Sequence, residues 1–543
     1  MKKRHLFWII PSSLIVLLLL ISLFGHLFSP IKTKKNVTKS KCLNNLTPKQ
    51  QDEDLAYLKY YLQNVYINYD QMAANGFDID KVIEDIKADY KRNLRNDGSI
   101  GSQEFFNSLR KIMFQNFNVV DKHFNIGGTW LLDNQFYFSN IYIKEEKTSS
   151  GSKYVVVKNE AETFPDYIKK SYANIGTAEI KPGQEYTGSK DNLYEWFDGN
   201  EKIYRFGVMT KGNTNFAYIQ IDGKPVKAPV IATWYLHNNK AQGFTETNDT
   251  LYLSLRNFMF EQSSSSELVA KNRKEFEKLC NNAKEKTAGK KNVIIDLRSN
   301  GGGELIRSAM LLSKLFYDEN DVSPELSQYL LNLVDDDYTL YSPATGAEYR
   351  KNMFNNVKNF FKTLKNKNKD NEYDEYTEKV YKKWHRSNYL HGILELFVPY
   401  RKEVKFPYAK TSITELPKPT FKGNIYVLTD NNSASCSEYT IALLHNMIKG
   451  TNINVCQIGF NTNGAVFYFN PWSFVFPNTG YTITFPTAIN KSNGFNFPNF
   501  KGEGYGWYPD YWCTNQNMIN TLVNLTGDKA LETTLAGLEK SQL

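Results

Sequence analysis

Residues 423–450 read GNIYVLTDNNSASCSEYTIALLHNMIKG. A β-rich run, 424–429, ends in the polar segment 430–432, and apolar residues recur at helical spacing from Ile441 onward. The pattern predicts a strand, a tight turn and a helix, with Ser435 at the turn. Free N–H groups at a helix N-terminus favour negative charge, and a serine nucleophile needs this setting because its attack on a carbonyl creates an oxyanion. The alternative interpretation is that these serines only cap the helix.

A second stretch, residues 291–304, reads KNVIIDLRSNGGGE. The apolar residues 293–295 predict a buried strand, and the Asn-Gly-Gly-Gly segment 300–303 follows the end of that strand. Three glycines allow backbone N–H groups to point inward without a Cβ in the way. A phosphate-binding loop is the other interpretation, but the segment has neither the Gly-Lys-Ser/Thr ending nor the GxGxxG spacing.

Together, the two stretches resemble the tail-specific, or C-terminal processing, serine peptidase family. That family carries a strand ending in Asp-Leu-Arg-x-Asn-x-Gly-Gly, which residues 296–303 match, and then Ser-Ala-Ser-x-Ser-Glu, which residues 433–438 match. The resemblance implies that Ser435 is the nucleophile. It also implies that the backbone N–H groups of Gly302 and Cys436 form the oxyanion hole.

The family uses two kinds of general base. In the Ser–Lys branch the lysine lies in a downstream Gly-x-x-Thr-x-Gly-Lys segment, but the matching segment 459–465 ends in Ala465. Lys449, on the predicted helix after Ser435, is expected to be exposed. The other branch, which includes the tricorn core protease, uses a serine, a histidine early in the chain and a glutamate late in it. The resemblance therefore points to the second branch.

Both residues of that branch have candidates here. Residues 119–124, VVDKHF, resemble the family's early Asp-x-His segment, and residues 503–510, EGYGWYPD, resemble its late glutamate segment. The resemblance implies that His123 takes the serine proton and that Glu503 fixes the histidine tautomer. The other interpretations are a half-buried structural histidine and a rim carboxylate in a glycine-rich loop. The surrounding motifs favour catalysis for His123 and leave both interpretations of Glu503 open.

The chain opens on the basic sequence MKKR, and residues 6–28 are largely apolar. At roughly 1.5 Å per helical residue this segment is about long enough to cross a hydrocarbon core. It predicts a signal or anchor segment over residues 1–30, with an uncleaved membrane anchor favoured and the rest of the chain exported. A tether rich in Lys, Asn and Thr follows over residues 31–51.

Apolar stripes at helical spacing predict an N-terminal helical region over residues 52–123, in which the third helix covers 102–117. Residues 124–210 are β-leaning and are interpreted as a diverged PDZ domain or another β module. The usual Gly-Leu-Gly-Phe-like loop of a PDZ domain is not found in this region. The sequence therefore predicts a helical part followed by a β-rich part before the peptidase motifs.

Helix and strand patterns alternate over residues 211–530, which are predicted to form the peptidase core. Residues 454–458 and 467–469 are expected to continue its sheet, and residues 481–485 are expected to add another strand. A long charged and aromatic segment, 317–419, is predicted as a helical insertion, either a solvated one or a lid over the substrate. The expected fold class is therefore α/β, and the resemblance implies a crotonase-like α/β core sheet.

Composition restricts the other classes of function. The formal net charge is +9, with 41% hydrophobic residues and five dispersed cysteines. No basic motif interleaved with aromatic residues indicates a nucleic-acid partner, and no CxxC pair indicates a zinc or redox site. The chemistry implied by the resemblance needs neither a metal nor a cofactor. The sequence does not indicate an oligomeric state, and the expected partner is a polypeptide substrate.

The sequence therefore predicts a serine endopeptidase that cleaves exported or membrane-associated proteins through an acyl-enzyme at Ser435. Two other classes remain: a catalytically inactive ligand- or peptide-binding protein on the same scaffold, and a structural cell-surface protein. In the structural class, Ser435→Ala costs only roughly 1 kcal/mol for a lost cap. In a peptidase the same change lowers activity by orders of magnitude.

Overall fold

The structure is a computed structural model. It describes residues 40–130, 134–149, 151–159, 180–198, 201–211, 214–232, 242–258, 266–334, 338–341, 403–405, 413–513 and 515–539, together with Leu17 and Leu20. The chain divides into two compact units: residues 1–131, 335–410 and 467–492 form the first, and residues 132–334, 411–466 and 493–543 form the second. The predicted anchor lies outside the described residues apart from those two leucines. Within the described part of the chain, no helix is both long and apolar enough to cross a bilayer.

The first unit begins with a group of helices. These are α2 (Pro48–Asn64), α3 (Tyr69–Ala74), α4 (Ile79–Tyr90), the 3₁₀ turn η1 (Lys91–Asn93) and α5 (Ser102–Asn116), and the short strands β1 (Asn45–Leu46) and β2 (Ile100–Gly101) pair beside them. The Asp78 carboxylate caps α4 by accepting the Asp80 N–H at 2.9 Å. The helix predicted over residues 102–117 is present as α5 and ends one residue earlier than predicted.

Within the described residues, the sheet of the first unit has six strands. They are β3 (Asn125–Ile126), β4 (Thr129–Trp130), β16 (Tyr338–Tyr341), β17 (Glu403–Lys405), β20 (Tyr468–Val475) and β21 (Thr482–Asn490). The prediction that residues 467–469 continue the core sheet is wrong, whereas the further strand expected at residues 481–485 is present as β21. Residues 468–469 lie in β20 and residues 482–485 lie in β21, and these two strands pair with each other in an antiparallel hairpin. The apolar side chains of this hairpin, among them Phe474 and Phe485, are buried in the same cluster as residues of α2 and α5, so the hairpin completes the core of the first unit.

The second unit contains the predicted α/β layer. Its parallel strands are β14 (Thr250–Ser254), β15 (Asn292–Asp296), β18 (Asn424–Thr429), β19 (Val455–Gly459) and β22 (Tyr511–Trp512), and β13 (Gly243–Glu246) is antiparallel at one edge. Every residue of β14, β15 and β19 is buried, as expected for parallel strands covered on both faces. This confirms the prediction of crossover units.

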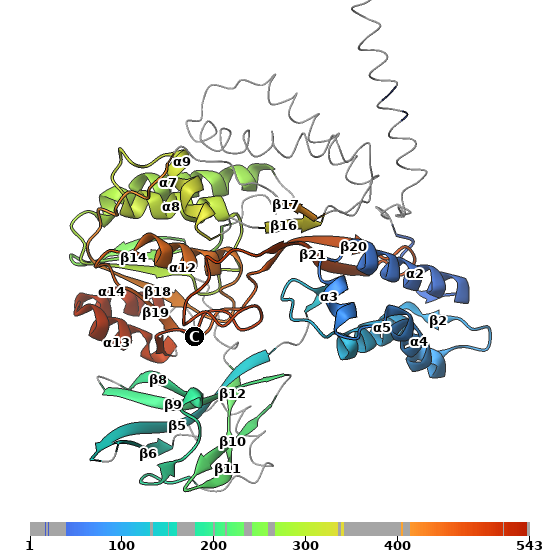
Figure 1. Ribbon diagram of the computed structural model, residues 1–543, viewed down its shortest axis with the longest axis horizontal. Helices are drawn as coiled ribbons and strands as arrows, with labels where there is room; N and C mark the ends of the chain where they lie inside the picture. Colours follow the sequence, from blue (N-terminus) through green and yellow to red (C-terminus); the bar gives the residue numbers. More distant parts are fainter. Residues whose placement is uncertain are drawn as a thin grey trace, which may run out of the picture. The chain divides into compact units, whose positions relative to one another are not determined.

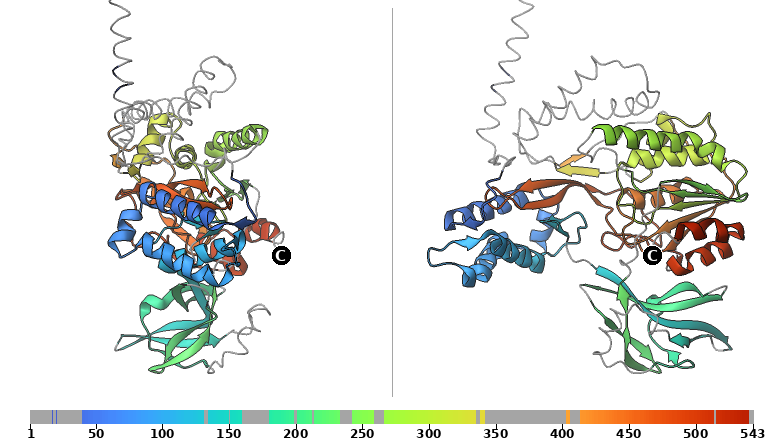
Figure 2. Two further views of the ribbon diagram at one scale, coloured as in Figure 1. Left: turned by 90° about the vertical axis from the view of Figure 1, so that its right-hand side faces the viewer. Right: turned by 180° about the vertical axis from the view of Figure 1, so that it is seen from behind.

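Helices cover both faces of these strands. Figures 1 and 2 show α7 (Ser266–Thr287), α8 (Leu305–Phe316), α9 (Pro324–Asn332) and α12 (Cys436–Met447) on one side, and α13 (Asn515–Thr526) and α14 (Ala530–Glu539) on the other. Ile294 and Leu428 are buried with Leu522 and Leu535, so alternate strand residues face the last two helices. The turn before α12 lies at the carboxyl end of β18, where active sites of open α/β sheets occur.

The remaining strands of the second unit form the β-rich module. They are β5 (Asn134–Thr148), β6 (Gly151–Asn159), β7 (Glu185–Tyr186), β8 (Leu193–Asp198), β9 (Glu201–Lys211), β10 (Phe216–Ile221), β11 (Lys224–Pro229) and β12 (Ile231–Ala232), with the 3₁₀ turn η3 (Lys190–Asn192). The module continues past the predicted end at residue 210, because β10 pairs with β7 through Ile221 and Tyr186. One pair, Trp196 with Trp512, joins β8 to β22. Of the predicted insertion 317–419, only α9, β16, β17 and the adjoining described residues can be examined.

Candidate active site

Ser435 lies on a strained turn between β18 and α12. Its backbone has φ 53° and ψ −115°, a conformation that side-chain-bearing residues rarely adopt. Such a residue costs on the order of 1–3 kcal/mol and persists only where the surrounding structure holds it. A strained serine at a strand-to-helix turn is the geometry of a nucleophile elbow, which exposes the hydroxyl above the sheet. An N-cap residue usually has β-region backbone angles, so capping alone does not explain the positive φ of Ser435.

Buried hydrogen bonds hold this turn against the second motif. The Ser299 N–H donates to the Asp430 carboxylate at 2.9 Å, and the Ser433 hydroxyl donates to the Leu297 carbonyl at 2.8 Å. The Ala434 N–H donates to the Asn300 carbonyl at 3.0 Å. Burial raises the pKa of Asp430 above its usual range. The two motifs quoted above therefore form one folded site.

The Asp-Leu-Arg part of the motif has a structural role. The Asp296 carboxylate accepts two hydrogen bonds from the Arg298 guanidinium, at 3.0 and 2.8 Å, and the Tyr252 hydroxyl donates to the same carboxylate. Both charged side chains are almost completely buried. Because the charges neutralise each other in a bidentate pair, the end of β15 is fixed where the glycine loop begins.

Gly302 packs directly against the serine turn. It has φ 98°, and a Cβ placed on it would lie 2.7 Å from both the Ala434 carbonyl oxygen and the Cys436 nitrogen. Only glycine fits this position without displacing backbone. The Gly302 N–H donates to the Asn300 side-chain oxygen at 2.9 Å. In this state the Gly302 N–H is therefore engaged within its own loop, and its part in an oxyanion hole stays a prediction.

Cys436 is the first residue of α12, so its N–H has no acceptor within the helix and lies at the positive end of the helix dipole. That N–H suits a developing oxyanion next to Ser435. The Cys436 thiol is fully buried, and burial raises its pKa well above the usual value. The thiol is therefore held protonated and inert, and Ser435 stays the predicted nucleophile of the motif.

Glu503 belongs to the same unit as Ser435. Its side chain is half-buried, and its carboxylate accepts the Val466 N–H at 2.9 Å. The loop that carries it, residues 501–510, precedes β22. Glu503 is thus held by backbone from the segment that follows β19, rather than lying free on a rim.

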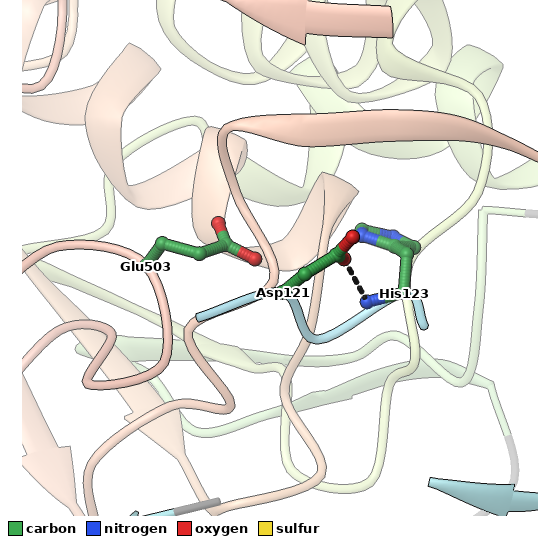
Figure 3. A group of neighbouring side chains, drawn as sticks. All are labelled: Asp121, His123 and Glu503. Atoms are coloured by element: carbon green, nitrogen blue, oxygen red, sulfur yellow. Dashed lines mark hydrogen bonds between the residues drawn. The ribbon is translucent and has the colours of Figure 1, made fainter. Parts of the chain in front are cut away.

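His123 lies in the other unit, just before β3. The Asp121 carboxylate accepts the His123 backbone N–H at 2.8 Å, as Figure 3 shows, and also the Tyr66 hydroxyl at 2.8 Å. Among the described residues, His123 Nδ1 has no hydrogen-bond partner. Burial lowers the pKa of His123 to about 4. The imidazole is therefore neutral at pH 7 and able to accept a proton.

The structure brings Ser435, Gly302 and Cys436 together and places Glu503 in the same unit. His123 belongs to the first unit, so the complete triad stays a prediction. None of these roles needs a metal ion, since acyl transfer by a serine uses only proton transfer and hydrogen-bond donors.

Residues 249–487 match the model of peptidase family S41. This region belongs to peptidase family S41. The chain is accordingly a serine peptidase, a hydrolase, as the sequence predicted. The matched S41 region contains Ser435, Gly302 and Cys436, whereas His123 and Glu503 lie outside it, so their assignment depends on the flanking motifs.

Several solved structures are similar to this chain. Mature CPAF is 13% identical with a TM-score of 0.44, and the match covers 91% of this chain and 98% of that one. The photosystem II D1 C-terminal processing protease is 12% identical with a TM-score of 0.29, covering 86% and 94% of the two chains. The tricorn protease is 12% identical with a TM-score of 0.29, covering 90% of this chain and 37% of that one. No curated protein sequence matches the chain.

The S41 region also shows why a lysine base is not available at the position expected for the Ser–Lys branch. Ala465 is buried there, and its N–H donates to the Glu438 carboxylate at 2.9 Å. The Lys449 ammonium donates to the Asn446 side chain at 2.7 Å and lies over the Phe497 ring. Its contacts are therefore with the end of α12 and the Phe497 ring.

Sequence reasoning missed Glu438, which is completely buried beneath the serine turn. It accepts four hydrogen bonds, including one from the Ser435 N–H at 3.0 Å. Burial raises its pKa to about 7, against the lowering effect of these donors. The available signal was a glutamate three residues after a helix-capping serine, which predicts a bond back to the cap backbone but not burial.

Proposed function

We propose that this S41 peptidase is a tail-specific endopeptidase that cleaves polypeptides with a Ser435–His123–Glu503 triad. The observation that carries the proposal is the strained backbone of Ser435, held at the N-terminus of α12 beside Gly302. Strain of this kind is retained where it serves a function, and here it presents the hydroxyl next to backbone N–H donors.

In the proposed reaction the Ser435 oxygen attacks the carbonyl carbon of the scissile peptide bond. His123 accepts the serine proton and later donates it to the leaving amine. Water then attacks the acyl-enzyme while His123 accepts a proton from it. His123 returns this proton to the Ser435 oxygen as the ester bond breaks, and the carboxyl product leaves. Glu503 orients the imidazole and stabilises its charged form. The low pKa of His123 supports a neutral resting imidazole, which the first proton transfer requires.

The oxyanion formed in both steps is assigned to the N–H groups of Cys436 and Gly302. The Cys436 N–H is positioned by α12, whereas the Gly302 N–H must share or release its bond to Asn300. Each such donor contributes several kcal/mol in the transition state, on the order of 3 kcal/mol. Substrate binding is therefore proposed to complete the oxyanion hole.

The substrates are proposed to be exported or membrane-associated polypeptides, and the enzyme itself is proposed to be exported and membrane-anchored or secreted. Support comes from the apolar residues 6–28 behind a basic N-terminus. Fractionation of cells that express the full chain tests this: recovery with the membrane or outside the cell is expected, and recovery only in the cytoplasm would contradict it.

A fluorophosphonate probe, which reports activated serines, tests the triad. Wild-type protein is expected to be labelled, with the adduct mapped to Ser435 by peptide mass spectrometry. Ser435→Ala and His123→Ala are expected to abolish labelling and Glu503→Ala to weaken it. Ser473→Ala, in the β20 strand, is the matched control and should label normally.

Labelling that survives His123→Ala would show that the base lies elsewhere. No labelling of a folded wild type would contradict the peptidase mechanism and favour an inactive binding protein on this scaffold.

A further inference from the structure

Glu438 forms a buried connection beneath the nucleophile. One carboxylate oxygen accepts the Ser435 and Ala465 N–H groups at 3.0 and 2.9 Å. The other accepts the Thr462 hydroxyl at 2.5 Å and the Gly464 N–H at 2.8 Å. An ionised carboxylate has about four acceptor sites, so all of them are filled. Glu438 thus connects the Ser435 turn to residues 462–465 through hydrogen bonds that occupy all of its acceptor sites.

Thr462 continues this connection into the Glu503 loop. Its hydroxyl donates to Glu438 and accepts the Trp507 N–H at 2.7 Å, and its own N–H donates to the Trp507 carbonyl at 3.0 Å. Thr462 is completely buried. A single hydroxyl therefore links α12 to the loop that carries Glu503.

The backbone around Gly464 packs directly against the Glu503 loop, with no space between the two segments. A Cβ on Gly464 would lie 2.6 Å from the Tyr505 nitrogen, and the Gly504 N–H donates to the Gly464 carbonyl at 2.7 Å. The Glu503 carboxylate in turn accepts the Val466 N–H. The two segments therefore contact each other both at Gly504 and through the Glu503 carboxylate. A shift of one segment must move the other.

We propose that Thr462, held by Glu438, is a positioning residue that sets the Glu503 loop relative to the Ser435 turn. This rests on the proposed function, in which Glu503 orients the general base. The hydrogen bonds of the Thr462 hydroxyl go to Glu438 and Trp507, so its effect is on geometry. Misplacement of a catalytic group by about 1 Å costs up to about a hundredfold in rate.

Thr462→Val is the decisive variant because valine keeps the shape and removes the hydroxyl. The expected result is that the maximal rate of fluorophosphonate labelling falls about tenfold to a hundredfold, while the half-saturating probe concentration stays within about threefold. Thr462→Ser restores the hydroxyl and should recover the rate to within about threefold. Thr521→Val, a buried threonine of α13 whose hydroxyl donates to the Asn517 carbonyl, is the matched control and should label at the wild-type rate.

Hydrogen–deuterium exchange provides a second readout that does not depend on activity. Loss of the Trp507 bond should speed exchange across residues 501–510 in Thr462→Val and leave it unchanged in Thr521→Val. If Thr462→Val does not fold, Glu438→Gln takes its place. The NH₂ group of the glutamine cannot accept hydrogen bonds, so two of the four groups that donate to Glu438 lose their acceptor and the same loop should loosen.

Labelling of Thr462→Val at the wild-type rate overturns the positioning proposal, and so does failure of Thr462→Ser to recover the rate. Unchanged exchange at residues 501–510 overturns it as well. In each of these cases a labelled wild type leaves the proposed function intact. No labelling of a folded wild type overturns both proposals, so the two failures are distinguishable.

Discussion

Replacement of Glu438 by glutamine tests whether this buried carboxyl group titrates near neutral pH. Burial raises its pKa from 4.5 to about 7. At 1.36 kcal/mol per pKa unit, this shift corresponds to about 3 kcal/mol of differential stability between the two protonation states. Glutamine cannot titrate, so this contribution is absent from the variant.

The sign follows from the direction of the shift. The folded state binds the Glu438 proton more tightly than the unfolded state does, so the group's favourable contribution is fully present below pH 4.5. It is lost as the pH rises through about 7. The unfolding free energy of the wild type minus that of Glu438→Gln should therefore fall by about 3 kcal/mol between pH 4.5 and pH 8.

Urea unfolding followed by tryptophan fluorescence at a series of pH values measures this difference. Glu84→Gln, on the exposed face of α4, is the matched control for the chemical change. A difference that stays constant over this range, or one that rises with pH, would refute the reasoning. Such a result would show that the four hydrogen bonds keep the Glu438 carboxylate ionised, because they lower its pKa more than burial raises it.

Two further changes test the geometry around the other site residues. Gly302→Ala should abolish fluorophosphonate labelling and lower the free energy of unfolding by about 2–4 kcal/mol. Alanine is strained at φ 98°, and its Cβ would lie 2.7 Å from backbone atoms of the serine turn. A variant with normal labelling would contradict this packing. Asp121→Ala leaves the buried Tyr66 hydroxyl and the His123 N–H without their acceptor, so it should destabilise by about 2–4 kcal/mol in urea and slow labelling. Asp121→Asn, which keeps one carbonyl oxygen, should be milder, and equal loss in both variants would argue against this account.

Local sequence patterns determined much of the fold and part of the site. The strand, turn and helix around Ser435, the buried strand before the glycine loop and the helix at residues 102–117 all agree with prediction. Periodicity and turn-forming residues specify backbone angles and the buried face of each element, and these act over a few residues. The composition of residues 293–295 similarly identified a strand buried on both faces.

Only the tertiary structure decided which distant segments meet. The pattern of residues 467–485 specifies two strands but not their partners, and their apolar side chains bury against α2 and α5 instead of extending the core sheet. The capture of the Gly302 N–H by Asn300 depends equally on how one loop folds back on itself.

Glu438 and Thr462 show most clearly what the sequence pattern could not predict. Their residue types suggest a helix cap and an ordinary loop threonine, yet they meet 24 positions apart in the chain in a site with no exposure to water. Burial sets the pKa of Glu438, and burial is a property of the whole packed unit, not of neighbours in the sequence. The proposed nucleophile can therefore be predicted from the sequence, whereas the hydrogen bonds that support its turn are known only from the fold.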